Sequence, residues 1–189
     1  MSLLNGMNNL TIERDDAVCV LIDLQEKLLP AMYEAAVTEQ NNLKLLKGMK
    51  LLGIPTIVTQ QYTKGIGETV PSVKELLGAF EHIEKKSFSC MGEPEFCRVL
   101  ESFDKGTVIL AGIEAHICVE QTALDLIKEG YKVALVTDCI QSRNPQNKER
   151  SIMRLAAAGA IITSCESVLY ELLGSAAAPE FKAVSAIVK

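Results

Sequence analysis

The feature that most constrains the fold is an alternation of short apolar runs with longer segments of helical spacing. The apolar runs are rich in β-branched residues and show no strict alternation of polar and apolar positions. Such runs are typical of strands that are covered on both faces, as in a parallel sheet. They lie at 17–23, 55–60, 81–85, 107–113, 132–138 and 160–163, the run at 81–85 being the weakest.

Between these runs, apolar residues recur at helical spacing. The pattern predicts helices over 38–52, 116–128 and 146–158, each followed closely by a glycine that favours termination. Strand and helix in alternation indicate βαβ units, with right-handed crossovers and helices on both faces of one sheet. The longest irregular segment, Gln60–Pro71, follows a strand, at the edge where open α/β sheets bind ligands. After Ser167 we expect short helices.

Composition narrows the class of protein. The chain has 189 residues, 48% of them hydrophobic, which suits a single domain over 1–189 with about residues 1–12 as an N-terminal extension. A formal net charge of −5, with scattered Lys and Arg, argues against nucleic acid or an anionic membrane surface as partner. No apolar stretch reaches the roughly 18 residues of a membrane span, and the N-terminus lacks the pattern of a signal peptide.

The six cysteines show no CxxC pair and no Cys/His cluster with metal-ligand spacing. Free thiols in a reducing compartment are the consistent interpretation, so we predict a cytoplasmic protein. Phosphate-binding, dinucleotide-binding and zinc-protease motifs are absent, and the chain has only two histidines. We therefore expect no metal and no cofactor.

Cys118 is the first candidate for chemistry. It follows the apolar run 107–113 after a short link and begins a helical segment. A helix N-terminus would lower the pKa of the thiol and offer backbone N–H groups to an oxyanion. The alternative is an inert core cysteine, which is common in globular proteins.

Asp23 and Lys85 also end apolar runs. At that edge Asp23 would act as a general base, although an acidic residue there also suits a helix N-cap. Lys85 would hold a substrate anion or stabilise a thiolate and carboxylate, but a surface lysine is the simpler alternative, and Lys86 competes for the role. Together, Cys, Asp and Lys would supply a nucleophile, a proton shuttle and a fixed cation without histidine.

The segments VLIDLQ, EKKSFS and LAGIEAHICVEQTALDLIKEGYKVALVTDCIQSR closely resemble the isochorismatase-like cysteine hydrolases. The likeness extends from Ala17 to about Lys182, and Gly112–Asp125 is its most specific part. It points to the small, single-domain members known as isochorismatase domain-containing proteins. It implies a three-layer α/β/α sandwich around a six-stranded, mainly parallel sheet.

The resemblance also implies the catalytic set Asp23, Lys85 and Cys118. Lys85 fits the family's spacing to a following aromatic and small residue, whereas Lys86 does not. Relatives place a non-proline cis peptide four residues before the cysteine, here Ile113–Glu114, which would aim the Glu114 and Cys118 amides at one oxyanion. We read Asp138 and Arg143 of the TDCIQSR segment as mainly structural, and His116 likewise.

Two departures from better-known relatives narrow the expected activity. The metal motif of nicotinamidases is absent, because Thr59, Gln60, Gln61 and Tyr62 stand in its place. True isochorismatases have glycine where this chain has Cys118, so the retained thiol indicates acyl transfer to sulfur. We predict hydrolysis of a small, amide-like C–N substrate through a thioester.

Two other functions remain open. One is isochorismatase-type hydrolysis that uses water and does not need the thiol. The other is a non-catalytic or redox-responsive scaffold that retains the fold. In either enzymatic case we expect Gln25, Gln60 and Tyr62 to contact a small-molecule substrate and, as in relatives, the chain to form a homo-oligomer.

Overall fold

The computed structural model describes residues 10–189, so most of the N-terminal extension expected at about residues 1–12 lies outside the described residues. Ile12 is already part of the domain, since its side chain is buried and its backbone N–H donates to Glu171 Oε1 at 2.7 Å. In order, the strands are β1 (Ala17–Ile22), β2 (Thr56–Gln61), β3 (His82–Lys85), β4 (Thr107–Ile113), β5 (Lys132–Gln141) and β6 (Ile161–Thr163).

Helices separate the strands. The α-helices are α1 (Ala35–Leu52), α2 (Thr63–Ile66), α3 (Pro71–Leu77), α4 (Pro94–Ser102), α5 (Glu120–Lys128), α6 (Pro145–Ala157), α7 (Cys165–Leu173) and α8 (Phe181–Val188). Shorter turns are the 3₁₀ turns η1 (Arg14–Asp16), η2 (Leu29–Ala31) and η3 (Cys90–Gly92) and the π-helical turn η4 (Ala115–Val119). Within the described residues, none of the helices is both long and apolar enough to cross a bilayer.

The six strands form one sheet in the order β3-β2-β1-β4-β5-β6, and every pairing is parallel. The predicted α/β fold and six-stranded sheet are therefore confirmed. From β1 the chain first moves outward through β2 and β3, then returns to place β4 on the other side of β1. In such sheets the crevice for ligands opens where the strand order reverses, at the carboxyl ends of β1 and β4.

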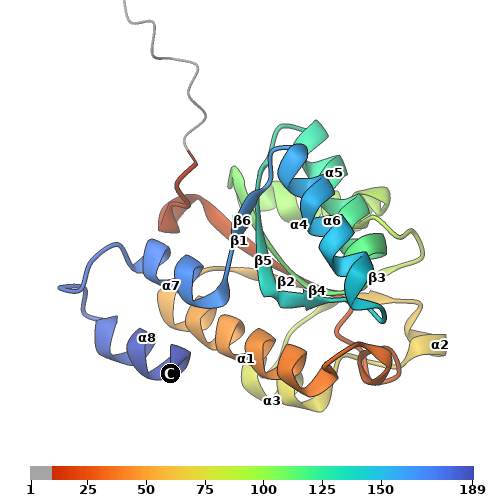
Figure 1. Ribbon diagram of the computed structural model, residues 1–189, viewed down its shortest axis with the longest axis horizontal. Helices are drawn as coiled ribbons and strands as arrows, with labels where there is room; N and C mark the ends of the chain where they lie inside the picture. Colours follow the sequence, from red (N-terminus) through yellow and green to blue (C-terminus); the bar gives the residue numbers. More distant parts are fainter. Residues whose placement is uncertain (1–9) are drawn as a thin grey trace, which may run out of the picture.

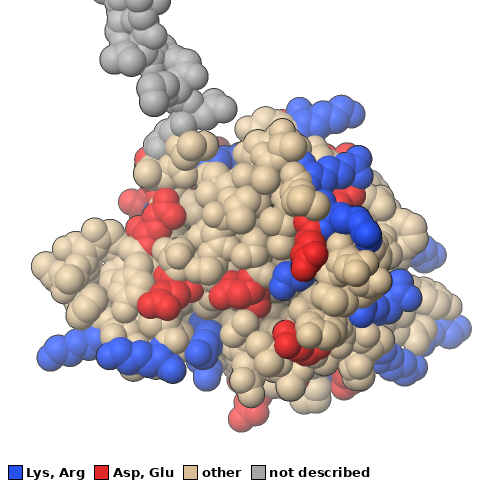
Figure 2. Space-filling model, in the orientation of Figure 1, with Lys and Arg blue, Asp and Glu red and all other residues tan. Residues whose placement is uncertain are grey.

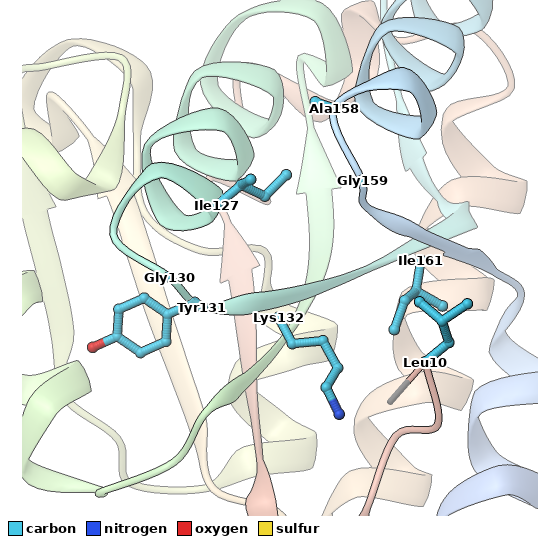
Figure 3. Close-up of a pocket in the computed structure, with 8 residues that line it drawn as sticks. All are labelled: Leu10, Ile127, Gly130, Tyr131, Lys132, Ala158, Gly159 and Ile161. Carbon is cyan, nitrogen blue, oxygen red and sulfur yellow. The ribbon is translucent and has the colours of Figure 1, made fainter. Parts of the chain in front are cut away.

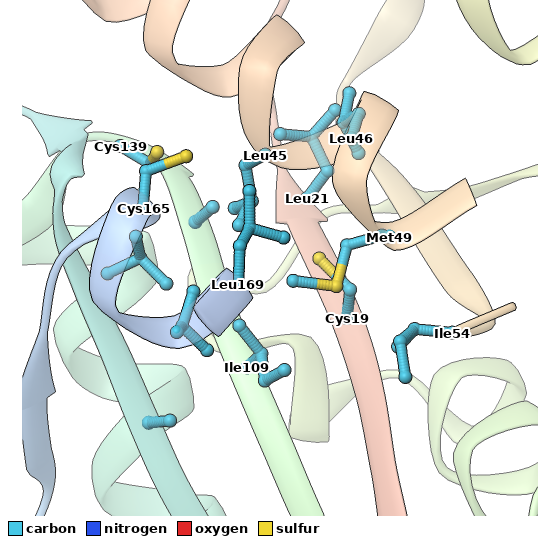
Figure 4. Close-up of a cluster of buried hydrophobic side chains, with 14 of the residues drawn as sticks. Cys19, Leu21, Leu45, Leu46, Met49, Ile54, Ile109, Cys139, Cys165 and Leu169 are labelled. Atoms are coloured by element: carbon cyan, nitrogen blue, oxygen red, sulfur yellow. The ribbon is translucent and has the colours of Figure 1, made fainter. Parts of the chain in front are cut away.

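Each face of the sheet is covered by its own set of helices. Helices α1, α3, α7 and α8 lie on one side and α4, α5 and α6 on the other (Figure 1). Along β1, Cys19 and Leu21 pack in the core on the α1 side, whereas Val18 and Val20 pack on the opposite side. Figure 4 shows the first of these cores, where α1 and α7 meet the strands. Burial on both faces explains why the strands are apolar without interruption.

The structure departs from the predicted boundaries mainly in the loops. Gln60–Pro71, expected to be irregular, contains the end of β2, the single turn α2, and Thr69 bridged to Gln25. A four-residue helix is too short to leave a periodic pattern, so only its tertiary contacts reveal it. The helix expected from residue 116 begins instead with the π turn η4, and α5 follows at Glu120.

Gly112 allows β4 to approach the end of β1. Its φ is +123°, and a Cβ atom at this position would lie 2.1 Å from the carbonyl oxygen of Ile22. Glycine alone fits such a close backbone approach. The contact lies next to Asp23, so it also shapes the carboxyl edge of the sheet.

Replacing Gly112 with alanine is expected to lower the free energy of unfolding by at least about 2 kcal/mol, because the clash is with backbone and the positive φ strains alanine. The midpoint of urea unfolding measures the change. Gly53→Ala is the matched control, since Gly53 has a φ of +71° but open space around its Cβ position. Equal losses in the two variants would contradict the close-approach argument.

Candidate active site

Asp23 follows directly after β1 and adopts a left-handed conformation, with a φ of +53°. Aspartate visits this region more readily than most residues. Its side chain is completely buried, and Thr59 Oγ1 donates a hydrogen bond of 2.8 Å to Oδ1. A buried carboxylate at the carboxyl edge of the central strand needs a compensating cation.

Lys85, the last residue of β3, supplies that cation. Its Nζ lies 2.7 Å from Asp23 Oδ2, and neither side chain is exposed. The same ammonium donates to Gln61 Oε1 at 2.5 Å and to the carbonyl oxygens of Ser87 and Phe88 at 3.3 and 3.2 Å. The neighbouring Lys86 is exposed, so the geometry favours Lys85 over its competitor.

The ammonium form of Lys85 is stabilised by its surroundings. Burial by itself opposes the charge, but Asp23, together with the Cys118 and Cys90 thiols, raises the pKa of Lys85 above its ordinary value. Lys85 is therefore positively charged at neutral pH. The Asp23–Lys85 contact is an ion pair, and Asp23 Oδ2 receives no hydrogen bond of good geometry.

Cys118 lies in the π turn between β4 and α5. Such turns are rare and occur frequently at functional sites. Two hydroxyl groups bind carbonyl oxygens of the turn: Thr122 donates to Cys118 O at 2.7 Å, and Ser151 donates to Ala115 O at 2.8 Å. Cys118 is only 5% exposed, and its thiol lies within hydrogen-bonding reach of both Asp23 and Lys85.

The expected lowering of the Cys118 pKa is wrong. Burial and the charge of Asp23 raise the pKa of the thiol to about 12, and Lys85 opposes them only in part. The partial charge of a helix terminus is too weak to outweigh desolvation beside a buried carboxylate. Cys118 therefore rests as a thiol, and its proton would have to move to a base as the sulfur attacks.

The cis peptide expected at Ile113–Glu114 is also wrong, because the structure has no cis peptide bond among its described residues. Glu114 instead adopts a left-handed conformation, with φ 56° and ψ 61°, and this turns the chain after β4.

The buried carboxylate of Glu114 pairs with Arg143, whose Nε lies 2.5 Å from Glu114 Oε1. His116 Nδ1 lies 2.9 Å from Ser142 Oγ and 3.4 Å from Glu114 Oε2. The contacts of Arg143 and His116 suit structural roles.

Two of the three residues expected to bind substrate are bonded to neighbouring loops. Gln25 is buried, and its amide donates to Gln61 O and Gly67 O and accepts from Gln61 N. Gln60 is also buried, between the hydroxyls of Thr69 and Thr63. Tyr62 is 48% exposed. Substrate contact by the three stays a prediction, and Tyr62 is the only one with a largely exposed side chain.

Three residues at the site were missed by sequence reasoning: Gln61, Thr59 and Cys90. Gln61 binds the Lys85 ammonium, and Thr59 binds Asp23. Cys90 is fully buried, and Asp23 and Lys85 both influence the pKa of its thiol. The one available signal was the run of polar residues that ends β2, TQQ, after an apolar start.

A separate hollow of about 390 Å³ lies at the opposite edge of the sheet (Figure 3). It is lined by Leu10, Ile127, Gly130, Tyr131, Lys132, Ala158, Gly159 and Ile161. These residues flank the starts of β5 and β6, and none belongs to the Asp23, Lys85 and Cys118 set.

Within the described part of the chain, no group of three or more His, Cys, Asp or Glu side chains is arranged to hold a metal ion.

Known proteins share this combination of sequence and fold. The family described as Isochorismatase domain matches residues 17–167 of the chain. The chain belongs to the isochorismatase family. Isochorismatase domain-containing protein 1 of Danio rerio is 38% identical over 167 residues, which cover 88% of this chain but 59% of that protein. The chain thus spans about three fifths of the length of that relative.

Solved structures of the family share the architecture. The MAR1 ribonuclease of Caenorhabditis elegans has a TM-score of 0.88 and 36% identity, covering 94% of this chain and 92% of its own. The YcaC gene product of Escherichia coli, described as an octameric hydrolase of unknown specificity, has a TM-score of 0.84 and 27% identity, covering 88% and 83%. The predicted family is therefore confirmed.

Proposed function

We propose that this isochorismatase-family protein is a cysteine hydrolase that cleaves a small, amide-like C–N bond through a thioester, with Asp23, Lys85 and Cys118 as catalytic residues. The observation that carries the proposal is the buried Asp23–Lys85 ion pair, of 2.7 Å, with the Cys118 thiol in reach of both charges. Inert core cysteines do not ordinarily adjoin a buried ion pair, because burying charges is costly. Perturbed titratable groups that cluster in this way are typical of catalytic sites.

The chemistry proceeds in two halves. In the first, Asp23 accepts the thiol proton as Cys118 Sγ attacks the carbonyl carbon, and the backbone amide of Cys118 stabilises the oxyanion. The C–N bond then breaks, and Asp23 returns the proton to the leaving nitrogen. In the second, water gives a proton to Asp23 and attacks the thioester. The C–S bond then breaks, and Asp23 returns the proton to the sulfur of Cys118, which restores the thiol. Lys85 keeps its proton throughout and stabilises each negative charge as it forms.

Restricted access supports a small substrate. Only 5% of Cys118 is exposed, and the segment after β2, with Tyr62, lies at the same edge of the sheet. We extend to this chain the homo-oligomeric assembly described for the Escherichia coli YcaC protein.

Trapping of the acyl-enzyme tests the proposal. The protein is incubated with a library of small primary amides and activated esters, quenched in acid and digested, and we expect an acyl adduct on the Cys118 peptide. The five other free cysteines serve as internal controls, since none should be acylated at a comparable rate. Acylation of Cys97, the one cysteine that is not buried, at a rate equal to that of Cys118 would contradict the proposal.

The library also includes a single-stranded RNA, because the Caenorhabditis elegans neighbour is named a ribonuclease. We expect no cleavage of it. The chain has a formal net charge of −5, and acidic and basic side chains both occur across the face in Figure 2. Cleavage of the RNA by the wild-type protein but not by Cys118→Ala would show that the substrate is RNA and not a small amide.

A further inference from the structure

Two buried side chains adjoin the catalytic carboxylate without a part in the steps above. Thr59, in β2, is completely buried and donates from Oγ1 to Asp23 Oδ1 at 2.8 Å. Cys90, in η3, is also completely buried, and its thiol lies within hydrogen-bonding reach of the Thr59 and Thr122 hydroxyls. Asp23 thus has a hydroxyl neighbour on Oδ1 that is itself in contact with a second thiol.

The direction of these hydrogen bonds follows from the protons available. A hydroxyl has one proton to donate and two lone pairs to accept with. Thr59 directs its proton to Asp23, so its oxygen has lone pairs left for the Cys90 thiol that lies within reach. Burial, followed by the charge of Asp23, raises the pKa of Cys90 to about 12, and Cys90 therefore keeps its proton at neutral pH. The Cys90 thiol, the Thr59 hydroxyl and Asp23 Oδ1 are thus successive neighbours, and the contact between Thr59 and Asp23 is a hydrogen bond.

The same cysteine is linked to the segment that carries the nucleophile. The backbone N–H of Cys90 donates to Thr122 Oγ1 at 2.9 Å, and Thr122 in turn donates to Cys118 O at 2.7 Å. Cys90 therefore lies next to two hydroxyl groups. One is that of Thr59, which is bonded to Asp23, and the other is that of Thr122, which is bonded to the carbonyl oxygen of Cys118. These contacts restrict the motion of the buried side chains around Asp23, and a proton transfer between two side chains requires such fixed positions.

The two oxygens of Asp23 are consequently different. Oδ1 is occupied by Thr59, whereas Oδ2 faces Lys85 at 2.7 Å and receives no directed hydrogen bond. We infer that Thr59, held in place by Cys90, is a positioning residue that engages Oδ1 and leaves Oδ2 as the atom that exchanges the proton with Cys118. This inference rests on the proposed function. The titratable groups that face Asp23 are Lys85 from β3, Cys118 from η4 and Cys90 from η3.

The pH dependence of Cys118 alkylation by acrylamide tests the inference. The rate, followed by mass spectrometry of the Cys118 peptide, should show an acidic limb, that is, a fall at low pH where the base that accepts the thiol proton is no longer available. In Thr59→Val the hydrogen bond to the carboxylate is lost with little change of shape, and we expect this acidic limb to move to higher pH by about one unit or more. Thr59→Ser keeps the hydroxyl, so its limb should stay near the wild-type position.

The Asp23→Asn variant distinguishes a failure of the proposed function from a failure of the role assigned to Thr59. If this variant keeps the acidic limb, Asp23 is not the base and the proposed function fails. If Asp23→Asn loses the limb while Thr59→Val superimposes on the wild type, the proposed function stands and the role of Thr59 is overturned.

Cys90 is tested in the same assay. Cys90→Ala is expected to move the limb in the same direction as Thr59→Val by a smaller amount, because the Thr59 hydroxyl then loses the buried neighbour that holds it in place. Cys90→Ser, which keeps a donor, should lie closer to the wild type. A Cys90→Ala profile identical to that of the wild type would overturn the part assigned to Cys90.

Discussion

Replacing Cys118 with alanine is expected to reduce turnover of the best small amide at least about 10⁴-fold, because the nucleophile and the covalent intermediate are lost together. The variant should remain folded, since alanine only shortens a side chain in a site already held by Thr122 and Ser151. The measurement is the steady-state rate of amide hydrolysis, with thermal unfolding recorded alongside.

The matched control for that loss is Cys97→Ala. Cys97 is a half-buried thiol of α4 whose Sγ lies 3.4 Å from Met91 O. This variant should keep full turnover. Activity that survives Cys118→Ala but is lost in Asp23→Asn would instead favour direct attack by water, as expected of true isochorismatases. If no substrate is turned over and Cys118 is no more reactive than Cys97, the non-catalytic scaffold becomes the better interpretation.

Replacing Lys85 with methionine is expected to lower the free energy of unfolding by about 3–5 kcal/mol, since it leaves the Asp23 carboxylate buried without its cation. The magnitude follows from the complete burial of both side chains and the 2.7 Å separation of Nζ and Oδ2. Urea unfolding at neutral pH measures the change, and catalysis should be lost as well.

Two further variants make the stability result specific. Lys86→Met, at the exposed neighbouring position, should change stability by no more than about 0.5 kcal/mol. In the double variant Asp23→Asn/Lys85→Met the unpaired charge is removed, so much of the lost stability should return. A Lys85→Met protein as stable as Lys86→Met would show that the pair is solvated rather than buried.

Several parts of the fold could be predicted because they depend on local patterns. Apolar runs at 17–23 and 107–113 identify β1 and β4 almost to the residue, because a strand buried on both faces must be apolar throughout. The end of α1 at Leu52 follows from Gly53, which takes the left-handed conformation that terminates the helix. The short helix α2 could not be predicted, since one turn of helix has no periodicity to detect.

The residues of the candidate site also divide into those that the sequence identified and those that it did not. The chain pattern and family likeness identified Asp23, Lys85 and Cys118 as candidates, because residues that follow parallel strands gather at one edge of the sheet. Thr59 and Cys90 carried no comparable signal: a threonine within a strand and a cysteine in a loop are ordinary residues. Their contacts with Asp23 arise only when β2 and η3 pack beside β1.

Sequence alone thus determined the α/β class and which strand ends lie at the carboxyl edge, since strand periodicity and chain order decide both, and the resemblance of its motifs to known relatives identified the family. The tertiary structure decided the electrostatics. It raised the pKa of Cys118 where a helix terminus suggested the opposite, kept the Ile113–Glu114 peptide trans, and placed Thr59 on one oxygen of Asp23. The physical reason is that desolvation and hydrogen bonding depend on every neighbour in space, and most of those neighbours are distant along the chain.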